Sequence, residues 1–507
     1  MTTATITLAG RGVTIADLVR VAREAAPVAL HAQARARVAA ARGVVDRLLS
    51  SEQSIYGLTS ALGANTGLPI PEGERSEYQV RAVRARAVGV GPAFATDVVR
   101  AMMFARLAGM AVGGSGVSPP VLDALSAMLN AGVHPVVPSI GSIGVADLAP
   151  LSHLALPLVG EGRAEYRGEV SSGREALARA GLQAVALGPK DGLALISANA
   201  ATVGHAALVL HDAAAALDNF NVAVALSFEA FCANLGPLDA RVQAARPARG
   251  QVAIAERLRE LLEGSGLWHD GVARRVQDPL SLRCVSQVHG AALAALRLAR
   301  DDVELELNSA ADSPLVLVDD VQLVSNGNFH IPALALALDG LGLALAQVAM
   351  LVVMRCQKLY NPALSGLPLQ LTTLGPSHSG FATVQKTLTS LYNQVRHLAN
   401  PSSLDGLPVS EAVEDHAPMA CNAVARIAAM LPLLRYLAAI ELLSAAQAVD
   451  LRPVAAAAMG RGAAGAYEML RGAVPMLVED RPLGPDIEAV AALIGGGRLP
   501  ISDLLAR

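Results

Sequence analysis

The sequence predicts a mainly α-helical protein in which a loop-rich helical region precedes a bundle of long helices. Stretches rich in Ala, Leu and Val support this prediction, because they exceed the usual length of a strand and carry few β-branched runs. Of the 507 residues, 53% are hydrophobic and 17% are charged, which excludes an intrinsically disordered chain. This length allows several domains or one large core.

Residues 1–190 are expected to form helices joined by functional loops. Gly, Pro and Ser interrupt this region at 63–71, 113–120 and 135–144. Two short extended pieces are expected, at Thr3–Leu8 and at Ala164–Val170. The amino-terminal region therefore carries its loops on a helical framework.

Residues 191–450 are expected to form the long-helix bundle, and residues 451–507 a helical tail. The stretches expected as helices are 191–235, 284–310, 331–360, 380–400 and 418–450. Helices that are apolar on most faces must be surrounded by other helices, and one chain of this size need not cover them all. Self-association through the bundle is therefore expected.

One segment, residues 332–354, is apolar enough to be considered as a membrane span. Asp339, Gln347 and two glycines interrupt it, so a helix buried in a large bundle is the preferred interpretation. The amino terminus has no basic stretch followed by a long apolar run, so no secretory signal is predicted. We expect a cytoplasmic protein with no membrane partner.

Charge and cysteine usage exclude other classes of partner. The net charge is −4 and no basic stripe is visible, which argues against binding to nucleic acid. The four cysteines form no CxxC pair and the eleven histidines form no HExxH cluster, so no metal site is expected. This cysteine pattern suits a reducing compartment. A phosphate loop and a GxSxG elbow are also missing, and no GxGxxG fingerprint follows a strand.

Six segments carry informative motifs, and their order along the chain is specific. They are IYGLTS at 55–60, GSIGVADLAPLSH at 141–153, VQDPLSLRC at 276–284, SNGNFH at 325–330, HSGF at 378–381 and VEDHAPM at 413–419. Together they closely resemble the aromatic amino-acid ammonia-lyase and aminomutase superfamily, from about Val13 to about Leu451. The resemblance implies a mainly helical homotetramer with a long central bundle, in which three chains build each active site.

The resemblance also implies an electrophile, methylidene-imidazolone (MIO), made from an internal Ala-Ser-Gly that precedes DLAPL. In this chain Gly144, Val145 and Ala146 precede Asp147, and the segment is one residue short. The chemistry needs a serine that can dehydrate and an unhindered glycine whose nitrogen attacks the preceding carbonyl. No Ala-Ser-Gly occurs anywhere in the chain. We therefore expect no MIO and no other cofactor.

Three further departures surround the missing electrophile. Leu280 stands where the family usually has a second catalytic tyrosine, and Ser197 replaces an asparagine that contacts the electrophile. Arg86 stands where ammonia-lyases often carry a histidine. These positions have changed together, which fits redesign of the site better than a single lesion.

Other positions match the family. Tyr56 matches the tyrosine that abstracts the β-proton, and Arg283 matches the arginine that binds the substrate carboxylate as a planar fork. Further matching pocket positions are Gln277, Asn328, Phe329 and Glu414. A structural reading exists for each: Tyr56 as a loop anchor, Arg283 in an ion pair with Asp278, and Phe329 in the core. The set of motifs around them favours the functional reading.

Without MIO, the substrate itself must supply a good leaving group. A quaternary ammonium does so, because it leaves as neutral trimethylamine. The family has a MIO-free branch of this kind, ergothionase, which this chain resembles in its missing tripeptide. Lys386 and Glu414 would then address an imidazole-type ring, although Lys386 is equally consistent with a solvated lysine.

Three functional hypotheses follow. The first is a MIO-free carbon–nitrogen lyase acting on a betaine of a histidine-type or other aromatic amino acid. The second is a MIO-free member with different chemistry, such as addition, isomerisation or slow ammonia elimination. The third is a non-catalytic binding protein, and the retained Tyr56 and Arg283 argue against it.

Overall fold

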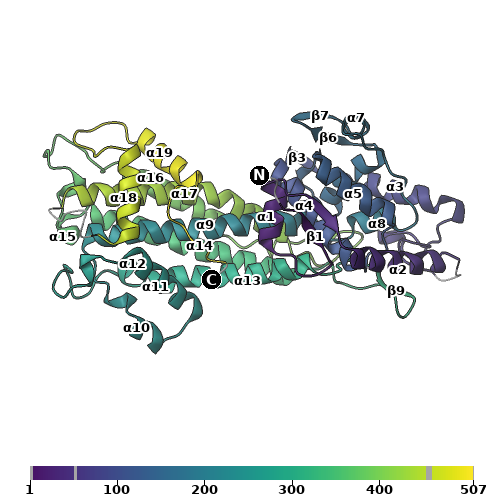
Figure 1. The fold of residues 1–507 in the computed structure, drawn as a ribbon, viewed down its shortest axis with the longest axis horizontal. Coiled ribbons are helices and arrows are strands. Elements are labelled where there is room, and N and C mark those ends of the chain that lie inside the picture. The colour runs from purple at the N-terminus through teal and green to yellow at the C-terminus, as the bar shows by residue number, and fades with distance from the viewer. Residues whose placement is uncertain (1–3, 51–53, 453–458, 506–507) are drawn as a thin grey trace. The chain divides into compact units, whose positions relative to one another are not determined.

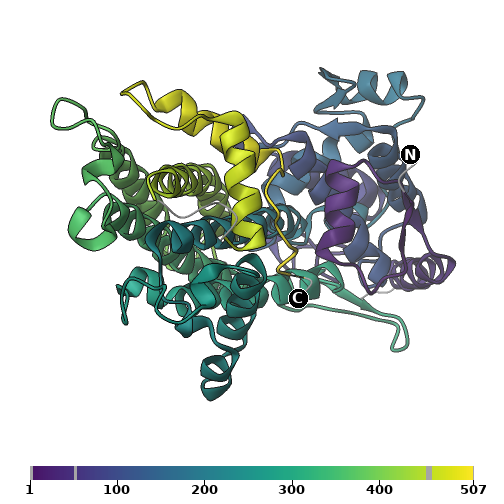
Figure 2. The same cartoon turned by 60° about the vertical axis from the view of Figure 1, so that its left-hand side comes forward.

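The computed structural model describes residues 4–50, 54–452 and 459–505, and within them the fold is mainly helical, as predicted (Figures 1 and 2). The α-helices are α1 (Ile15–Arg23), α2 (Ala32–Leu48), α3 (Arg75–Arg86), α4 (Thr96–Val112), α5 (Pro119–Ala131), α6 (Leu148–Ala155), α7 (Gly173–Arg179), α8 (Asp191–Ile196), α9 (Ala200–Phe231), α10 (Ala240–Ala245), α11 (Arg249–Leu261), α12 (Leu280–Arg283), α13 (Val285–Leu307), α14 (Pro332–Leu359), α15 (Pro362–Ser365), α16 (Val384–Leu398), α17 (Ala420–Asp450), α18 (Arg461–Ala473) and α19 (Gly484–Gly495).

Short 3₁₀ helices and strands complete the secondary structure. The 3₁₀ helices are η1 (Gly63–Asn65), η2 (Glu72–Glu74), η3 (Leu156–Val159), η4 (Gly236–Leu238), η5 (Gly266–Trp268) and η6 (Leu369–Leu371). The strands are β1 (Ile6–Leu8), β2 (Val28–Leu30), β3 (Val90–Ala93), β4 (Val133–Pro135), β5 (Pro138–Ile140), β6 (Arg163–Tyr166), β7 (Glu169–Ser172), β8 (Leu315–Leu317) and β9 (Gln322–Val324).

The chain divides into two compact units, and each is discontinuous in sequence. Unit 1 comprises Met1–His211, Ala299–Leu336 and Ser402–Val424, and unit 2 comprises Asp212–Leu298, Ala337–Pro401 and Ala425–Arg507. Four boundaries fall inside α9, α13, α14 and α17. The sequence suggested the continuous regions 1–190, 191–450 and 451–507 instead, because apolar periodicity runs through each long helix without a break at the boundary.

Helix α4 is central to unit 1, where it packs against α1, α2 and α5. A capping box starts α1: Thr14 accepts a hydrogen bond from the Asp17 amide at 3.2 Å, and the Asp17 carboxylate accepts one from the Thr14 amide at 3.1 Å. Helix α4 ends at Gly113, whose φ of +106° suits only glycine. Helix α8 packs against α3 and α6, and so brings two amino-terminal helices to the segment that ends at Ser197.

The strands of unit 1 form four small sheets. Strands β1 and β2 pair in parallel, whereas β3 with β5, β6 with both β4 and β7, and β8 with β9 pair antiparallel. The extended piece expected at Ala164–Val170 is a hairpin of β6 and β7, because Arg167 and Gly168 both take positive φ and reverse the chain. The piece expected at Thr3–Leu8 is β1 from Ile6 onward, and Thr3 lies outside the described residues.

Unit 2 contains long helices that are joined by buried polar contacts. Arg355 on α14 binds both carboxylate oxygens of Glu441 on α17, and the Ser227 hydroxyl on α9 donates to Glu441 at 2.9 Å. Arg257 on α11 pairs with Asp218 on α9 at 2.9 Å. Such pairs cost desolvation energy but admit one register of the helices, since a shift would leave a buried charge unpaired.

Three helical segments are long and apolar enough to cross a membrane by length and composition alone: Asp191–Phe231, Pro332–Leu359 and Ala420–Asp450. In their most apolar windows 94%, 61% and 50% of the residues are buried inside the protein. On α14, Leu343 and Met350 are 48% and 39% exposed and lie seven residues apart, so they share one face. This chain therefore leaves an apolar face of α14 uncovered in unit 2.

Candidate functional site

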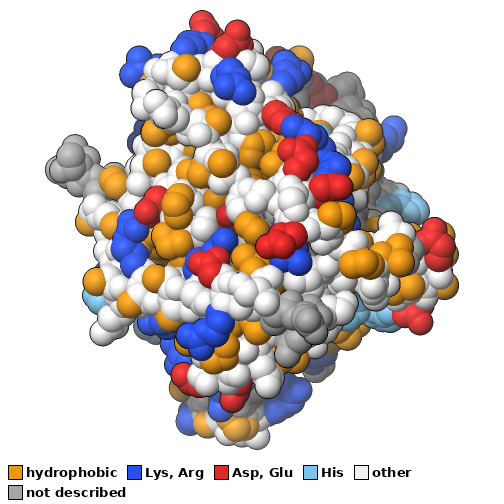
Figure 3. Space-filling model, turned by 90° about the vertical axis from the view of Figure 1, so that its right-hand side faces the viewer, with side chains coloured by type: hydrophobic (Ala, Val, Ile, Leu, Met, Phe, Trp, Pro, Cys, Tyr) orange, Lys and Arg blue, Asp and Glu red, His pale blue; other side chains and the backbone are white. Residues whose placement is uncertain are grey.

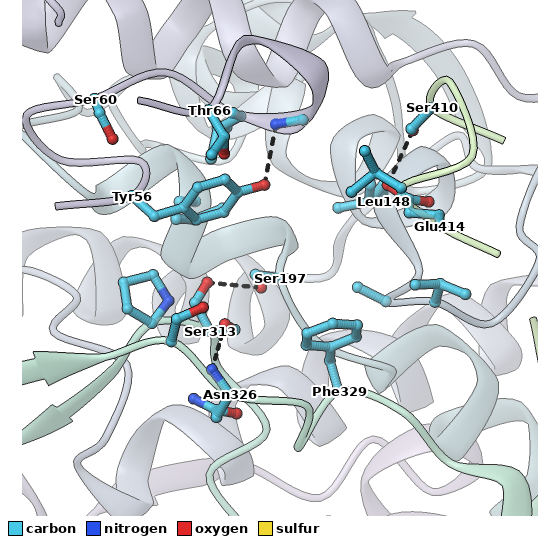
Figure 4. Close-up of a pocket in the computed structure, with 18 of the residues that line it drawn as sticks. Tyr56, Ser60, Thr66, Leu148, Ser197, Ser313, Asn326, Phe329, Ser410 and Glu414 are labelled. Carbon is cyan, nitrogen blue, oxygen red and sulfur yellow. Dashed lines mark hydrogen bonds between the residues drawn. The ribbon is translucent and has the colours of Figure 1, made fainter. Parts of the chain in front are cut away.

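Unit 1 contains a pocket of about 980 Å³ that five parts of the chain line (Figure 4). The first is the loop 54–67, the second is the end of α3 at Ala85 and Arg86, and the third is the loop 145–148 together with Leu193 and Ser197. The fourth is the segment 313–329, and the fifth is the turn 410–414. Hydroxyl groups from several serines, Thr66 and Tyr56 reach this pocket, as does the amide of Asn326. Residues far apart in sequence thus converge on one concave site.

Tyr56 is held in the first loop by main-chain geometry. Gly57 takes a φ of +69°, and a Cβ at this position would lie 2.4 Å from Leu193 Cδ2, so only glycine fits the turn. Gln79 donates from Nε2 to the Gly57 carbonyl at 3.1 Å. The Tyr56 hydroxyl accepts a hydrogen bond from the Gly63 amide at 3.1 Å. Its own hydrogen is therefore left for a ligand or a base in the pocket.

The loop that carries Val145 and Ala146 is anchored by Asp147. This fully buried carboxylate accepts hydrogen bonds from the Ser142 hydroxyl at 2.7 Å and the Thr202 amide at 2.7 Å. Burial raises the pKa of Asp147, and the hydrogen bonds from Thr202 and Ser142 oppose that rise. Ala146 takes a φ of +52°, a conformation that costs an alanine about 1 kcal/mol. Asp147 therefore holds a strained loop at the pocket wall.

A second wall is formed by Ser197, Ser313 and Asn326. The Ser197 hydroxyl donates to the Ser313 carbonyl at 3.4 Å, and the Asn326 amide donates to the Ser313 hydroxyl at 3.2 Å. The Phe329 ring points into the pocket beside this wall (Figure 4), and its carbonyl accepts a hydrogen bond from Asn199 Nδ2. These contacts fix both the polar wall and the aromatic ring.

Glu414 enters the pocket from a tight turn. The Val409 amide donates to the Glu414 carbonyl at 2.9 Å, and the Ser410 hydroxyl donates to Glu414 Oε1 at 3.1 Å (Figure 4). Between them Ser410, Glu411 and Ala412 have φ values of +53°, +52° and +65°. Three consecutive non-glycine residues in this region are strained, and such strain is typical of functional sites. The turn holds Glu414 Oε1 in place and leaves Oε2 for a ligand.

The pocket joins seven of the residues that the sequence singled out. They are Tyr56, Arg86, Val145, Ala146, Ser197, Phe329 and Glu414. Gly144 is buried beside them, with a φ of +80°, and Asn328 is exposed in the turn before Phe329, where its amide donates to Asn326 Oδ1 at 2.9 Å. Gln277, Arg283 and Lys386 belong to unit 2 and do not line this pocket.

Arg283 lies at the end of α12, in a segment that hydrogen bonds from Asn234 and Arg355 hold in place. The Asn234 amide donates to Asp278 at 2.6 Å, and Arg355 Nη1 donates to the Ser281 carbonyl at 3.2 Å. In the described part of unit 2 no close ion pair joins Arg283 to Asp278, but burial raises the pKa of Asp278 and the charges of Arg275 and Arg283 oppose that rise. Gln277 is exposed on the same segment. The segment that carries the Arg283 guanidinium is therefore held by hydrogen bonds to Asp278 and Ser281, which precede it in sequence.

Lys386 is exposed on α16 in an open polar groove of unit 2. Gln357, Gln385 and Asn393 line the groove with it. The turn before α16 is held by Asp480, which accepts hydrogen bonds from the amides of Ser379 and Gly380 at 2.6 and 2.9 Å. Those two hydrogen bonds lower the pKa of Asp480.

Sequence reasoning missed Ser313, Asn326 and Ser410. A signal existed for Asn326, which lies in the SNGNFH motif, whereas nothing in the sequence marks the strained turn that carries Ser410. No group of three metal-ligating side chains occurs within the described ranges. On the face drawn in Figure 3, the described basic and acidic side chains are interspersed.

Comparison with known proteins places this arrangement in a family. The family profile described as aromatic amino acid lyase matches residues 13–472. Histidine ammonia-lyase of Symbiobacterium thermophilum is 41% identical over 491 residues, which cover 97% of this chain and 96% of that protein.

Two solved structures are also similar. One is the ergothioneine-degrading enzyme ergothionase from Treponema denticola in complex with desmethyl-ergothioneine sulfonic acid, with a TM-score of 0.94, 33% identity and coverage of 98% of this chain and 99% of that one. The other is tyrosine aminomutase from Streptomyces globisporus, with a TM-score of 0.92, 33% identity and coverage of 99% and 100%. The chain therefore belongs to the aromatic amino acid lyase family.

Proposed function

We propose that this protein is a carbon–nitrogen lyase that forms no MIO and eliminates an amine from an aromatic or histidine-type amino-acid derivative, giving an aryl-acrylate. The observation that carries the proposal is the pair Val145 and Ala146 at the pocket wall, directly before Asp147. The electrophile would require a serine and a glycine in this loop.

The residues of the loop do not fit the MIO group. Val145 and Ala146 have no hydroxyl to lose, and Gly144 precedes them rather than following a serine. The nearest serine, Ser142, is followed by Ile143, and its hydroxyl donates to Asp147 and accepts from the Gly144 amide at 3.0 Å. This serine is held in place as an anchor of the loop.

The chemistry then rests on the side chains of the pocket. Tyr56, as phenolate, accepts the β-proton, the C–H electron pair forms the new double bond, and the C–N bond breaks with its electrons on the departing nitrogen. A quaternary ammonium leaves as a neutral amine and needs no covalent activation. The Gly63 amide, which donates to the Tyr56 oxygen, supports the negative charge that the base must carry.

The substrate we propose is a trimethylated, histidine-type betaine. The similarity to ergothionase, at a TM-score of 0.94, supports this choice together with the missing tripeptide. Glu414 and Lys386 would then bind the ring, and Arg86 and Ser197 would line its pocket. The 41% identity to a histidine ammonia-lyase favours a second candidate, ammonia elimination from histidine itself. The loop at Gly144–Ala146 argues against that candidate.

We further propose a cytoplasmic homotetramer in which other copies of the chain supply the missing pocket residues. Arg283, Gln277 and Lys386 do not line the pocket of unit 1, although Arg283 and Gln277 match substrate-binding positions of the family and Lys386 is proposed to bind the ring. The exposed apolar face of α14, with Leu343 and Met350, supports association, as does exposed Leu280 (59%) beside Arg283. Sedimentation should give a tetramer, and a stable monomer at micromolar concentration would contradict this.

A substrate panel tests the proposed function. The purified protein is incubated with histidine, hercynine, ergothioneine, phenylalanine and tyrosine, and ultraviolet absorbance reports a conjugated acrylate. We expect product from a betaine and no inactivation by borohydride, since that reagent attacks MIO. Product from histidine with borohydride sensitivity would establish the second candidate. Binding without any turnover would instead indicate a non-catalytic member.

A further inference from the structure

Two histidines form a hydrogen-bonded pair beside the pocket of unit 1. His330 Nε2 and His416 Nδ1 lie 2.8 Å apart, and the two rings meet edge to face with their centroids 4.9 Å apart. One ring must donate and the other must accept, so at least one imidazole is neutral. Burial and the charge of His416 lower the pKa of His330, which favours this state at neutral pH.

His330 belongs to the wall that carries Phe329. It follows Phe329 directly in sequence, and its main chain pairs with Val145 in an antiparallel bridge. Phe329 and Val145 both line the pocket. The Asn199 side chain donates to the Phe329 carbonyl and so ties the same stretch to the start of α9. His330 is therefore attached to a wall that is itself held by main-chain pairing and by a side chain.

The turn 409–416, which carries Glu414 into the pocket, is strained. Its residues 410–412 have positive φ although none of them is glycine. Little packing opposes this strain, because the side chain of Val413 is 68% exposed. The main-chain hydrogen bonds between Val409 and Glu414 close the turn on itself and do not attach it to the rest of unit 1. The turn therefore needs another contact to stay at the pocket wall.

His416 supplies that contact. Among the described residues, its hydrogen bond to His330 is the only one that joins the turn 409–416 to the rest of unit 1. His416 lies two residues after Glu414, so the bond acts close to the carboxylate. The pair thus connects the wall that carries Phe329 to the turn that carries Glu414.

We propose that the His330–His416 hydrogen bond holds Glu414 at the pocket wall, so that both histidines are positioning residues for ligand binding by Glu414. Neither histidine touches the ligand. The proposal rests on the proposed function in one respect, because it takes Glu414 as the group that binds the ring of the ligand. Without the bond the turn leaves the wall for part of the time, and a ligand must first bring it back.

Two ligands that share an acrylate and differ in the ring test the proposal. Urocanate carries an imidazole N–H that can donate to a carboxylate, whereas cinnamate carries a phenyl ring. Binding of each to the full-length protein is measured by calorimetry at neutral pH. His416→Ala should weaken urocanate binding about two- to tenfold, which is the size of one hydrogen bond, and leave cinnamate binding unchanged. Equal losses for both ligands, or no loss for urocanate, would overturn the proposal.

Rescue and double-mutant cycles separate positioning from general damage. Asparagine places an amide where histidine has Nδ1, so His416→Asn should keep the bond and bind urocanate as the wild type does. His330→Ala should match His416→Ala, and the two changes together should cost no more than either alone. In a Glu414→Ala background, His416→Ala should have no further effect. Additive losses in either cycle, or a His416→Asn protein that behaves as His416→Ala does, would overturn the proposal.

The matched control is His31→Ala. His31 is also an exposed histidine of unit 1, and its Nδ1 accepts a hydrogen bond from the Gln33 amide at 3.2 Å, but this bond lies within the cap of α2. Its loss should leave the affinity for both ligands unchanged. A loss of urocanate affinity equal to that of His416→Ala would overturn the proposal.

A measurement without ligand decides the case in which neither compound binds. Hydrogen–deuterium exchange of peptides that span 409–416 should quicken about two- to tenfold in His416→Ala, and keep the wild-type rate in His416→Asn and His31→Ala. Unchanged exchange in His416→Ala would overturn the proposal. Turnover plays no part in these measurements, so a protein that shows the expected pattern but converts no substrate would refute the proposed function and leave the role of the pair standing.

Discussion

Replacing Tyr56 by phenylalanine separates the chemistry of the pocket from its stability, because the chain contains a matched control. The change removes the proposed base and the hydrogen bond from the Gly63 amide, and keeps the ring. In the same loop the Leu62 amide donates to the hydroxyl of Tyr78 at 2.9 Å, and Tyr78 does not line the pocket. Tyr78→Phe therefore removes an equivalent hydrogen bond and no pocket group.

The magnitudes follow from these contacts. Each variant loses one hydrogen bond to a partly buried hydroxyl, which costs about 0.5–1.5 kcal/mol of unfolding free energy. General-base catalysis contributes about 10²–10⁴-fold, so Tyr56→Phe should lower kcat by at least about 10²-fold while Tyr78→Phe leaves it within about twofold. Urea unfolding and initial rates on the best substrate measure both quantities. Wild-type turnover by Tyr56→Phe would refute the elimination mechanism, whatever the fold.

Three further predictions concern binding and stability. Arg283→Lys keeps the charge and loses the planar fork, so KM should rise more than kcat falls, and an unchanged KM would remove Arg283 from the carboxylate site. Burial, helped by Asp302, raises the pKa of Glu306 from 4.5 to about 7, so the folded protein should lose up to about 3 kcal/mol of stability as pH rises from about 4.5 to about 7. Glu306→Gln should remove that loss, so the difference in unfolding free energy between variant and wild type should grow as pH rises. Urea unfolding measures this difference, and a difference that stays constant with pH would contradict the prediction. Ala412→Gly should raise the unfolding free energy by about 1 kcal/mol, because glycine adopts the φ of +65° without strain; calorimetry that shows destabilisation would argue against strain there.

The sequence predicted the long helices well, because an apolar stretch such as 331–360 is too long for a strand and needs no tertiary information to be recognised. It also predicted, through a resemblance of motifs, that Tyr56, Phe329 and Glu414 share a site, and all three line the pocket of unit 1. Periodicity alone would not have joined residues so far apart in sequence.

Other features could not be predicted from the sequence, for physical reasons. The strain at Ser410 depends on backbone angles that alanine, serine and glutamate rarely adopt, so composition gives no sign of it. The limits of the two units also escaped prediction, because four of the five fall inside continuous helices.

The discontinuity of the units has a consequence for synthesis on the ribosome. Unit 1 uses residues up to Val424, although its first stretch ends at His211. At about 5–20 residues per second, translation of the intervening segment takes roughly 10–40 s, during which the first stretch lacks its partners. Apolar surface that the finished protein buries is exposed to solvent for that time. The nascent chain should therefore depend on chaperones that hold apolar segments, and a carboxy-terminal truncation before Ser402 should aggregate rather than yield a folded amino-terminal fragment.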